Sequence, residues 1–183
     1  CDLFIYVGGE SDAWAEQVLE QTPNEERRVL HLMNALEAEG LLMDNGSGEH
    51  THNHEEHAHL DEEEANYDME NEEHHHEIMD EHIWMSLSNA SYLVSVISRE
   101  ILNFDPDGNY TQNTERYQAE LERVDAAFQN VVEEGRNTTL VVADRFPYRY
   151  LLRDYGLDYC AAYEGCSAET EASFDIIIEM AQK

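Results

Sequence analysis

Nine of the ten histidines of this chain fall within one segment, residues 49–82. Acidic runs, such as the one at residues 61–64, separate these histidines, and large apolar side chains are almost absent from most of the segment. A stretch of this composition cannot bury enough apolar surface to offset the entropy of ordering it. We therefore expect residues 45–79 to form a disordered, solvated loop, and the folded core to come from the sequence on either side.

The histidines of this loop predict contact with metal ions. Neutral imidazole is the commonest zinc ligand, and neighbouring carboxylates raise the local concentration of cations. A solubilising linker is the plain alternative, although the His-x-His spacing favours metal contact. Because a flexible loop loses conformational entropy when it wraps an ion, we expect weak, exchangeable capture. The loop histidines predicted to take part are His50, His52, His54, His57, His59, His74, His75 and His76.

The charge balance points to cations as partners. Asp and Glu total 41 against 10 Lys and Arg, which gives a formal net charge of -31. This balance argues against nucleic acid or anionic lipid as a partner, because phosphate binding needs basic clusters. No nucleophile and base arrangement and no phosphate-binding glycine loop stands out, so we predict a binding protein rather than an enzyme. His31, inside an apolar stretch, is expected to be a packed or surface residue.

Outside the loop, short apolar runs alternate with amphipathic helical patterns. Strands are predicted at residues 3–7, 139–143 and 158–163, and helices after residue 86 and at 111–134, 146–155 and 171–180. Residues 139–163 therefore predict a βαβ unit with parallel strands. A strand at residue 3 and an unfinished helical pattern at the end suggest that the natural chain continues in both directions.

His82 differs from the other histidines because it lies where the loop meets a helix. It stands next to Trp84 and ahead of a well-formed apolar stripe, so packing is expected to fix its position. Preorganised ligands bind better than mobile ones. On this ground alone His82 is a candidate metal ligand, and a purely structural role stays open.

Residues 80–86, Asp-Glu-His-Ile-Trp-Met-Ser, resemble a motif of the zinc and manganese solute-binding receptors of ABC importers. In that family an Asp-x-His-x-Trp motif precedes a helix, and its His is a metal ligand. A histidine-rich acidic insertion ahead of this His is typical of the zinc members. Further segments resemble the family in the same order along the chain: residues 3–9 with Trp14, the helix at 111–134, Phe146-x-Tyr148 with residues 154–157, and residues 167–173.

The chain departs from the family pattern at one ligand position. Members usually have His or Glu three residues before the Phe of Phe-x-Tyr, where this chain has Ala143. Asp144 follows directly and stands at the carboxyl end of a strand, where α/β proteins place ligands, so it is a candidate substitute. Arg145 can equally hold Asp144 in a salt bridge. The other ligands of the family fall before Cys1 and after Lys183.

The resemblance implies an α/β fold with two lobes, parallel sheets flanked by helices, and a long rigid helix that links the lobes. Residues 1–104 are expected to end the N-terminal lobe, residues 105–137 to form the linking helix, and residues 138–183 to begin the C-terminal lobe.

The function that this resemblance implies is binding of zinc, with manganese as the alternative, by a monomeric extracytoplasmic receptor. Its partner is the permease of an ABC importer, and a lipid anchor outside this chain is expected to hold it at the membrane. Zinc is favoured because imidazole suits its borderline-soft character. An acidic, His-rich metal-buffering protein without a role in transport is the rival hypothesis.

Overall fold

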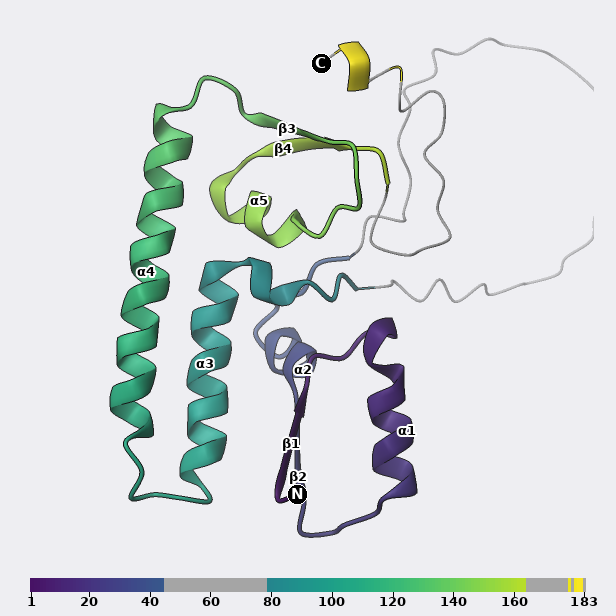
Figure 1. Cartoon of the computed structure of the whole chain (residues 1–183), viewed down its shortest axis with the longest axis vertical. Helices are drawn as coiled ribbons and strands as arrows, with labels where there is room; N and C mark the ends of the chain where they lie inside the picture. The colour runs from purple at the N-terminus through teal and green to yellow at the C-terminus, as the bar shows by residue number, and fades with distance from the viewer. Residues whose placement is uncertain (45–78, 164–177, 179, 183) are drawn as a thin grey trace, which may run out of the picture.

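The computed structural model describes residues 1–44, 79–163, 178 and 180–182 (Figure 1). The eight predicted loop histidines and residues 167–173 lie outside this part of the chain. Most of the predicted helix at 171–180 lies outside it as well. None of the described helices combines the length and the apolar character that crossing a membrane requires.

The first part of the fold is a parallel strand pair with its connecting helix. Strand β1 (Leu3–Tyr6) pairs with β2 (Arg28–His31), and a short 3-10 helix, η1 (Glu10–Asp12), and α1 (Ala13–Gln21) lie between them in sequence. Helix α2 (Leu32–Glu37) follows β2 without a loop. The change from strand to helix is possible because His31 Nδ1 accepts a hydrogen bond of 3.0 Å from the backbone N–H of Asn34, which caps the helix.

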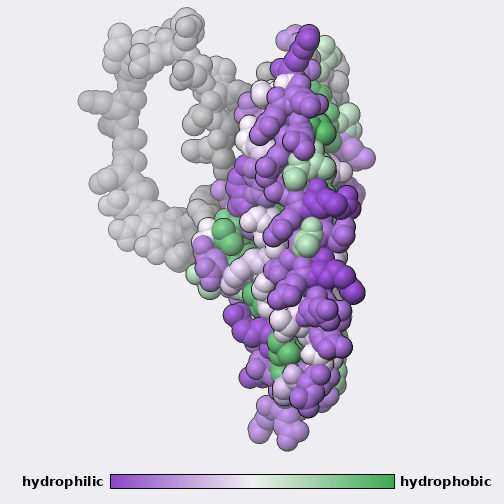
Figure 2. All heavy atoms as spheres, turned by 90° about the vertical axis from the view of Figure 1, so that its left-hand side faces the viewer, coloured by the Kyte–Doolittle hydropathy of each residue, from purple (hydrophilic) through white to green (hydrophobic). Residues whose placement is uncertain are grey.

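Two long helices lie side by side, and the second of them forms the left-hand margin of the view in Figure 1. The 3-10 turn η2 (Ile83–Met85) leads into α3 (Leu87–Leu102), and α4 (Tyr110–Glu134) runs back along it. Ser86 caps α3, since its Oγ accepts a hydrogen bond of 3.0 Å from the backbone N–H of Asn89. Helix α4 confirms the predicted helix at 111–134, and it begins one residue earlier, at Tyr110. The face of the molecule that carries α4 is predominantly hydrophilic (Figure 2).

The last part of the described fold is a second parallel pair, β3 (Thr139–Val142) with β4 (Asp158–Ala161), joined through α5 (Arg149–Tyr155). The predicted βαβ unit is confirmed, but the start of its helix at residue 146 is wrong. Pro147 disfavours the helical conformation at the residue before it, so Phe146 cannot open the helix. Its ring is buried instead and stacks on Tyr159, with 4.2 Å between ring centroids.

In the core, α5 packs against residues of α2, η2 and α3. Its buried cluster comprises Met33, Leu36, Ile83, Leu93 and Tyr150. Tyr150 comes from α5, whereas the other four residues precede α4, so helices far apart in sequence share one core. Because apolar burial is the main favourable term in folding, this cluster holds the two parts of the chain together. The prediction of an α/β fold with parallel strands and a long connecting helix is confirmed.

Candidate metal centre

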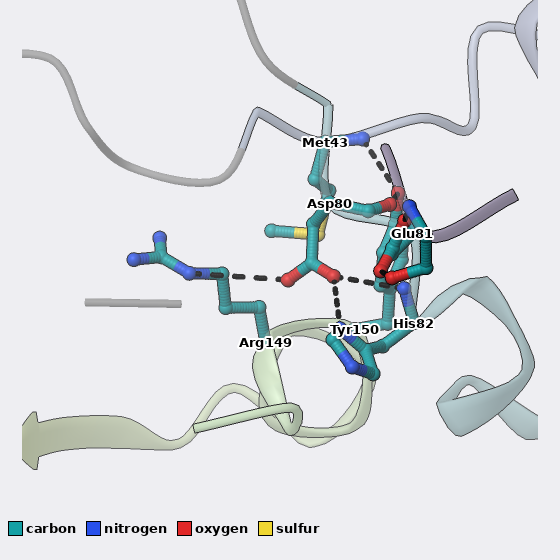
Figure 3. A network of polar contacts seen from close by, with 7 residues as sticks. Met43, Asp80, Glu81, His82, Arg149 and Tyr150 are labelled. Atoms are coloured by element: carbon teal, nitrogen blue, oxygen red, sulfur yellow. Dashed lines mark hydrogen bonds and ion pairs between the residues drawn. The ribbon is translucent and has the colours of Figure 1, made fainter. Parts of the chain in front are cut away.

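His82 lies directly before η2, on the first turn that follows residues 45–78 (Figure 3). The backbone N–H of Met85 donates a 3.0 Å hydrogen bond to the His82 carbonyl, and Ile83 beside it is fully buried. The His82 side chain retains 18% of its exposure, so it is held by its neighbours but not sealed from solvent. The expectation that packing fixes this histidine is confirmed.

The carboxylate of Asp80 orients the imidazole of His82. Asp80 Oδ1 accepts hydrogen bonds from His82 Nδ1 at 2.8 Å and from the His82 backbone N–H at 2.9 Å. A carboxylate only accepts, so Nδ1 must carry the hydrogen, and in the neutral ring Nε2 keeps its lone pair. This is the arrangement in which metal-binding histidines are commonly held. His82 is therefore able to bind a cation through Nε2.

The same contact alters the proton affinity of His82. The pKa of His82 is raised above its ordinary value chiefly by the hydrogen bond to Asp80, while burial acts in the opposite direction. Metal ions bind the unprotonated nitrogen, so protons and metal compete for Nε2. The electrostatics that favour a cation at this ring therefore also favour a proton.

Asp80 supports the site without being free to act as a second ligand. Its side chain is only 4% exposed, and Oδ1 is occupied by His82. The other oxygen, Oδ2, faces Arg149 Nε at 3.9 Å, so a positive charge from α5 partly balances the buried carboxylate. The sequence motif contained Asp80, but its role as the residue that orients His82 was not predicted. The spacing of two residues in Asp-x-His was the available signal.

Tyr150 is a further residue of this network that sequence reasoning missed. Its hydroxyl accepts a 3.0 Å hydrogen bond from the backbone N–H of Met43 and donates one of 2.9 Å to the carbonyl of Asp80 (Figure 3). Arg153, one turn along α5, donates to the carbonyl of Leu41 at 3.2 Å. No local pattern could have indicated these contacts, because the partners lie 70 to 112 residues apart.

Glu81 fastens the turn to the end of the first strand pair. Its carboxylate accepts a 3.1 Å hydrogen bond from the backbone N–H of Ser11, and the Ser11 hydroxyl also donates to it. Trp84 is 48% exposed, and its ring centroid lies 5.6 Å from that of His82. The tryptophan is therefore close enough to report on events at His82.

Asp144 is exposed at the end of β3, as the sequence placed it. Its Oδ1 accepts a 2.7 Å hydrogen bond from the backbone N–H of Arg145, and within the described residues its carboxylate makes no ion pair with the Arg145 guanidinium. Within residues 1–44 and 79–163, no hydrogen bond or ion pair joins Asp144 to His82. Ala143 carries no group that could bind a metal. The role of Asp144 as a ligand stays a prediction.

The described residues do not form a complete metal site by themselves. Across residues 1–44 and 79–163, no group of three or more His, Cys, Asp or Glu side chains is close enough to hold a metal ion. His31, the other described histidine, is a structural residue, since it caps α2 and packs edge-on against Tyr6. His82 with Asp80 is therefore the arrangement in this part of the chain that best fits a metal ligand.

Comparison with known proteins gives a consistent result over the full length. The family model described as "ZnuA: Zinc-uptake complex component A periplasmic" matches residues 1–183. The zinc-binding lipoprotein AdcA of Streptococcus pneumoniae is 27% identical over 187 residues, which cover 99% of this chain and 32% of AdcA. The manganese-binding lipoprotein MntA of Halalkalibacterium halodurans is 29% identical over 114 residues, covering 56% of this chain and 37% of MntA.

Solved structures share the fold. A Zn(II)-bound variant of AdcAII from Streptococcus pneumoniae matches with a TM-score of 0.65 at 19% identity, over 100% of this chain and 58% of that one. The metal-dependent lipoprotein YcdH of Bacillus subtilis gives a TM-score of 0.66 at 18% identity, over 100% and 55% of the two chains.

These matches bear on two predictions. The chain spans about a third of the length of the curated relatives that it matches. The two-lobed α/β fold is confirmed by the structural neighbours, and the prediction of a binding protein rather than an enzyme is confirmed by the family and these relatives.

Proposed function

Since the chain belongs to the family of periplasmic zinc-uptake components, we propose that it is part of an extracytoplasmic receptor that binds divalent metal and delivers it to an ABC importer permease. The observation that carries this proposal is the hydrogen bond of 2.8 Å from His82 Nδ1 to Asp80, which leaves Nε2 available for a metal. The receptor acts as a monomer, and a lipid anchor outside this chain keeps it at the membrane, as the lipoprotein relatives suggest.

Zinc is the favoured cargo and manganese the alternative. A neutral imidazole nitrogen is a good ligand for zinc, whereas manganese prefers carboxylate, carbonyl and water oxygens. The relatives include a zinc-binding and a manganese-binding lipoprotein, so the family accommodates both ions. With His82 as a ligand and Asp80 committed to orienting it, the described part of the site favours zinc.

The histidine-rich segment and the His82 site have separate tasks in this proposal. The eight histidines of residues 50–76 capture metal weakly, and His82 belongs to the selective site. Residues 1–104 end the first lobe, 105–137 link the lobes, and 138–183 begin the second. Asp144 is a second ligand in the position next to Ala143.

The test separates the His82 site from the histidine-rich segment. Because Asp44 and Met79 form an antiparallel bridge, a short Gly-Ser turn can replace residues 45–78 without separating the two ends of the gap. Zinc affinity is then measured by competition with a chelator in the shortened chain and in its His82→Asn variant. The Asn side chain can still donate to Asp80 but lacks the metal-binding nitrogen. We expect a zinc site that depends on His82 before the substitution and no such site after it.

The rival hypothesis is a metal-buffering protein, favoured by the concentration of histidines in residues 49–82. A buffer of that kind loses nearly all of its zinc binding when residues 45–78 are replaced, and His82→Asn then changes nothing further. A shortened chain whose zinc affinity is the same with and without His82 would therefore support the buffer and contradict the receptor.

Asp144 is tested by Asp144→Asn in the shortened chain, which removes the charge and keeps the size. As a control, Asp158→Asn changes an exposed Asp at the start of β4, which lies at the opposite end of the same pair of parallel strands. A ligand role predicts weaker zinc binding for the first substitution only. Equal affinities in the two variants would exclude Asp144 from the site.

A further inference from the structure

We propose that Tyr150 is a positioning residue for the metal site, because its buried hydroxyl holds the backbone of Asp80, whose carboxylate in turn orients His82 (Figure 3). The inference rests on the proposed role of His82 as a metal ligand. It assigns a task in metal binding to a helix of the second strand pair, 70 residues along the chain from Asp80.

The Tyr150 hydroxyl closes a ring of hydrogen bonds around the backbone of Asp80. It accepts from Met43 N–H at 3.0 Å and donates to the Asp80 carbonyl at 2.9 Å, while Asp80 N–H donates to the Met43 carbonyl at 2.8 Å. Tyr150 is 0% exposed, so water does not compete for these bonds. Both the donor and an acceptor site of the hydroxyl are used, which fixes its orientation. The backbone of Asp80 is thus held from two sides.

This fixed backbone sets where the imidazole lies. Asp80 and His82 are two residues apart, and one oxygen of Asp80 binds both the backbone N–H and the Nδ1–H of His82. A shift of the Asp80 backbone therefore moves the ring that carries the metal-binding nitrogen. Metal ligands must be held within about 0.5 Å of their productive positions, so a small displacement is enough to weaken binding.

Arg149, the neighbour of Tyr150 on α5, acts on the carboxylate itself. Its Nε lies 3.9 Å from Asp80 Oδ2, and its side chain is only 10% exposed. Among the described residues this Nε has no hydrogen-bond partner, so Asp80 is the charge that it faces. Attraction between Arg149 and Oδ2 leaves Oδ1 directed toward His82. Helix α5 therefore contacts Asp80 through two consecutive residues, one on the backbone and one on the side chain.

Helix α5 also offers a matched control on its far side. The hydroxyl of Tyr155 donates a 2.8 Å hydrogen bond to Asp125 on α4, and its ring stacks on Phe128 at 5.6 Å. Tyr155→Phe removes one partly buried hydrogen bond from the same helix, and this bond is not part of the network around Asp80 and His82. A general loosening of α5 affects both tyrosine variants, whereas a positioning role affects Tyr150→Phe alone.

The experiment uses the full chain, free of metal, and observes the His82 Nδ1–H by proton NMR. The hydrogen bond to Asp80 should protect this proton from exchange with water, and its signal is assigned by its loss in His82→Asn. We expect Tyr150→Phe to shift the signal and to speed its exchange about tenfold or more, and Tyr155→Phe to leave it in place. An unchanged signal in folded Tyr150→Phe, or equal changes in the two variants, would overturn the proposal.

A second variant keeps the proposal testable if Tyr150→Phe does not fold. Arg149→Met removes the charge that faces Asp80 Oδ2 and keeps an unbranched side chain as far as the position of Nε. We expect the same His82 signal to shift, and a signal identical to the wild type would overturn the role of α5. Zinc competition adds a separate readout, with an expected loss of about tenfold for the His82-dependent site. If no zinc site depends on His82, the proposed function fails, while the proton signal still decides whether α5 positions the ring.

Discussion

Asp80→Ala should destabilise the fold because it removes the residue that orients His82. The substitution removes the acceptor for two hydrogen bonds from His82, at 2.8 and 2.9 Å, and leaves the guanidinium of Arg149 buried without the charge that it faces. Hydrogen bonds to a charged group each contribute about 1.5–3 kcal/mol. Removing one partner of a buried ion pair costs about 3–5 kcal/mol.

The structure selects the lower end of this range. Arg149 Nε stands 3.9 Å from Oδ2, which is beyond hydrogen-bond distance, and the His82 ring can recover some hydration through its 18% exposure. We therefore expect Asp80→Ala to lower the free energy of unfolding by about 3 kcal/mol. This is a large share of the total for a small domain, which is about 5–15 kcal/mol. Asp80→Asn, which keeps an acceptor oxygen, should cost less.

Urea unfolding of the metal-free protein at pH 7 measures this cost. With a slope of about 2 kcal/mol per molar urea, the midpoint for Asp80→Ala should fall by about 1.5 M. Asp144→Ala is the control, because Asp144 is exposed and, among the described residues, bonds only to the following backbone N–H. Its midpoint should therefore stay within about 0.25 M of the wild type. An equally small shift for Asp80→Ala would mean that the carboxylate is solvated and does not hold His82.

Three further predictions concern the surroundings of His82. Ile83→Ala should lower the free energy of unfolding by about 2–5 kcal/mol in thermal or urea unfolding, because Ile83 is 0% exposed in the core cluster. Gly8→Ala should also destabilise the fold, since Gly8 has φ +101° and an added Cβ would collide with the His31 ring; an unfolding midpoint equal to the wild type would contradict this. Because the pKa of His82 is raised by Asp80, zinc affinity of the shortened chain should begin to fall at a pH above the usual histidine range and then drop about tenfold per pH unit on acidification. Asp80→Asn should move that onset to lower pH in zinc titrations. An onset at the same pH in Asp80→Asn would mean that Asp80 does not set the pH dependence of zinc binding.

Elements with a local pattern were predictable from the sequence. The helix at 110–134 and the unit β3–α5–β4 each carry a periodicity that a short window contains, so their type and order follow without knowledge of the tertiary structure. The apolar stretch around His31 could not be divided into its elements from the sequence. It holds the end of β2 and most of α2, and no break separates them. Only the pairing with β1 and the cap at His31 separate the two elements.

The contacts that organise the site are long-range, and this is why sequence reasoning found His82 but not its supports. Tyr150 meets Asp80 and Met43 across 70 and 107 positions, and Arg149 reaches the same carboxylate from the same helix. A tyrosine in an amphipathic helix reads as an ordinary core residue, and Tyr150 does lie in the core. The proposed positioning role of Tyr150 depends on the hydrogen bond from its hydroxyl to the Asp80 carbonyl, which only the packed structure determines.

The orientation of His82, rather than its residue type, is what suits it to a selective site. Every one of these side chains offers an imidazole nitrogen, so composition alone cannot separate capture from a selective site. At His82, Asp80 fixes which nitrogen carries the proton, and α5 holds Asp80. Preorganisation lowers the entropy lost on binding, and affinity rises without any additional ligand. Substitutions that leave every histidine in place but release the ring of His82 should therefore weaken zinc binding at this site.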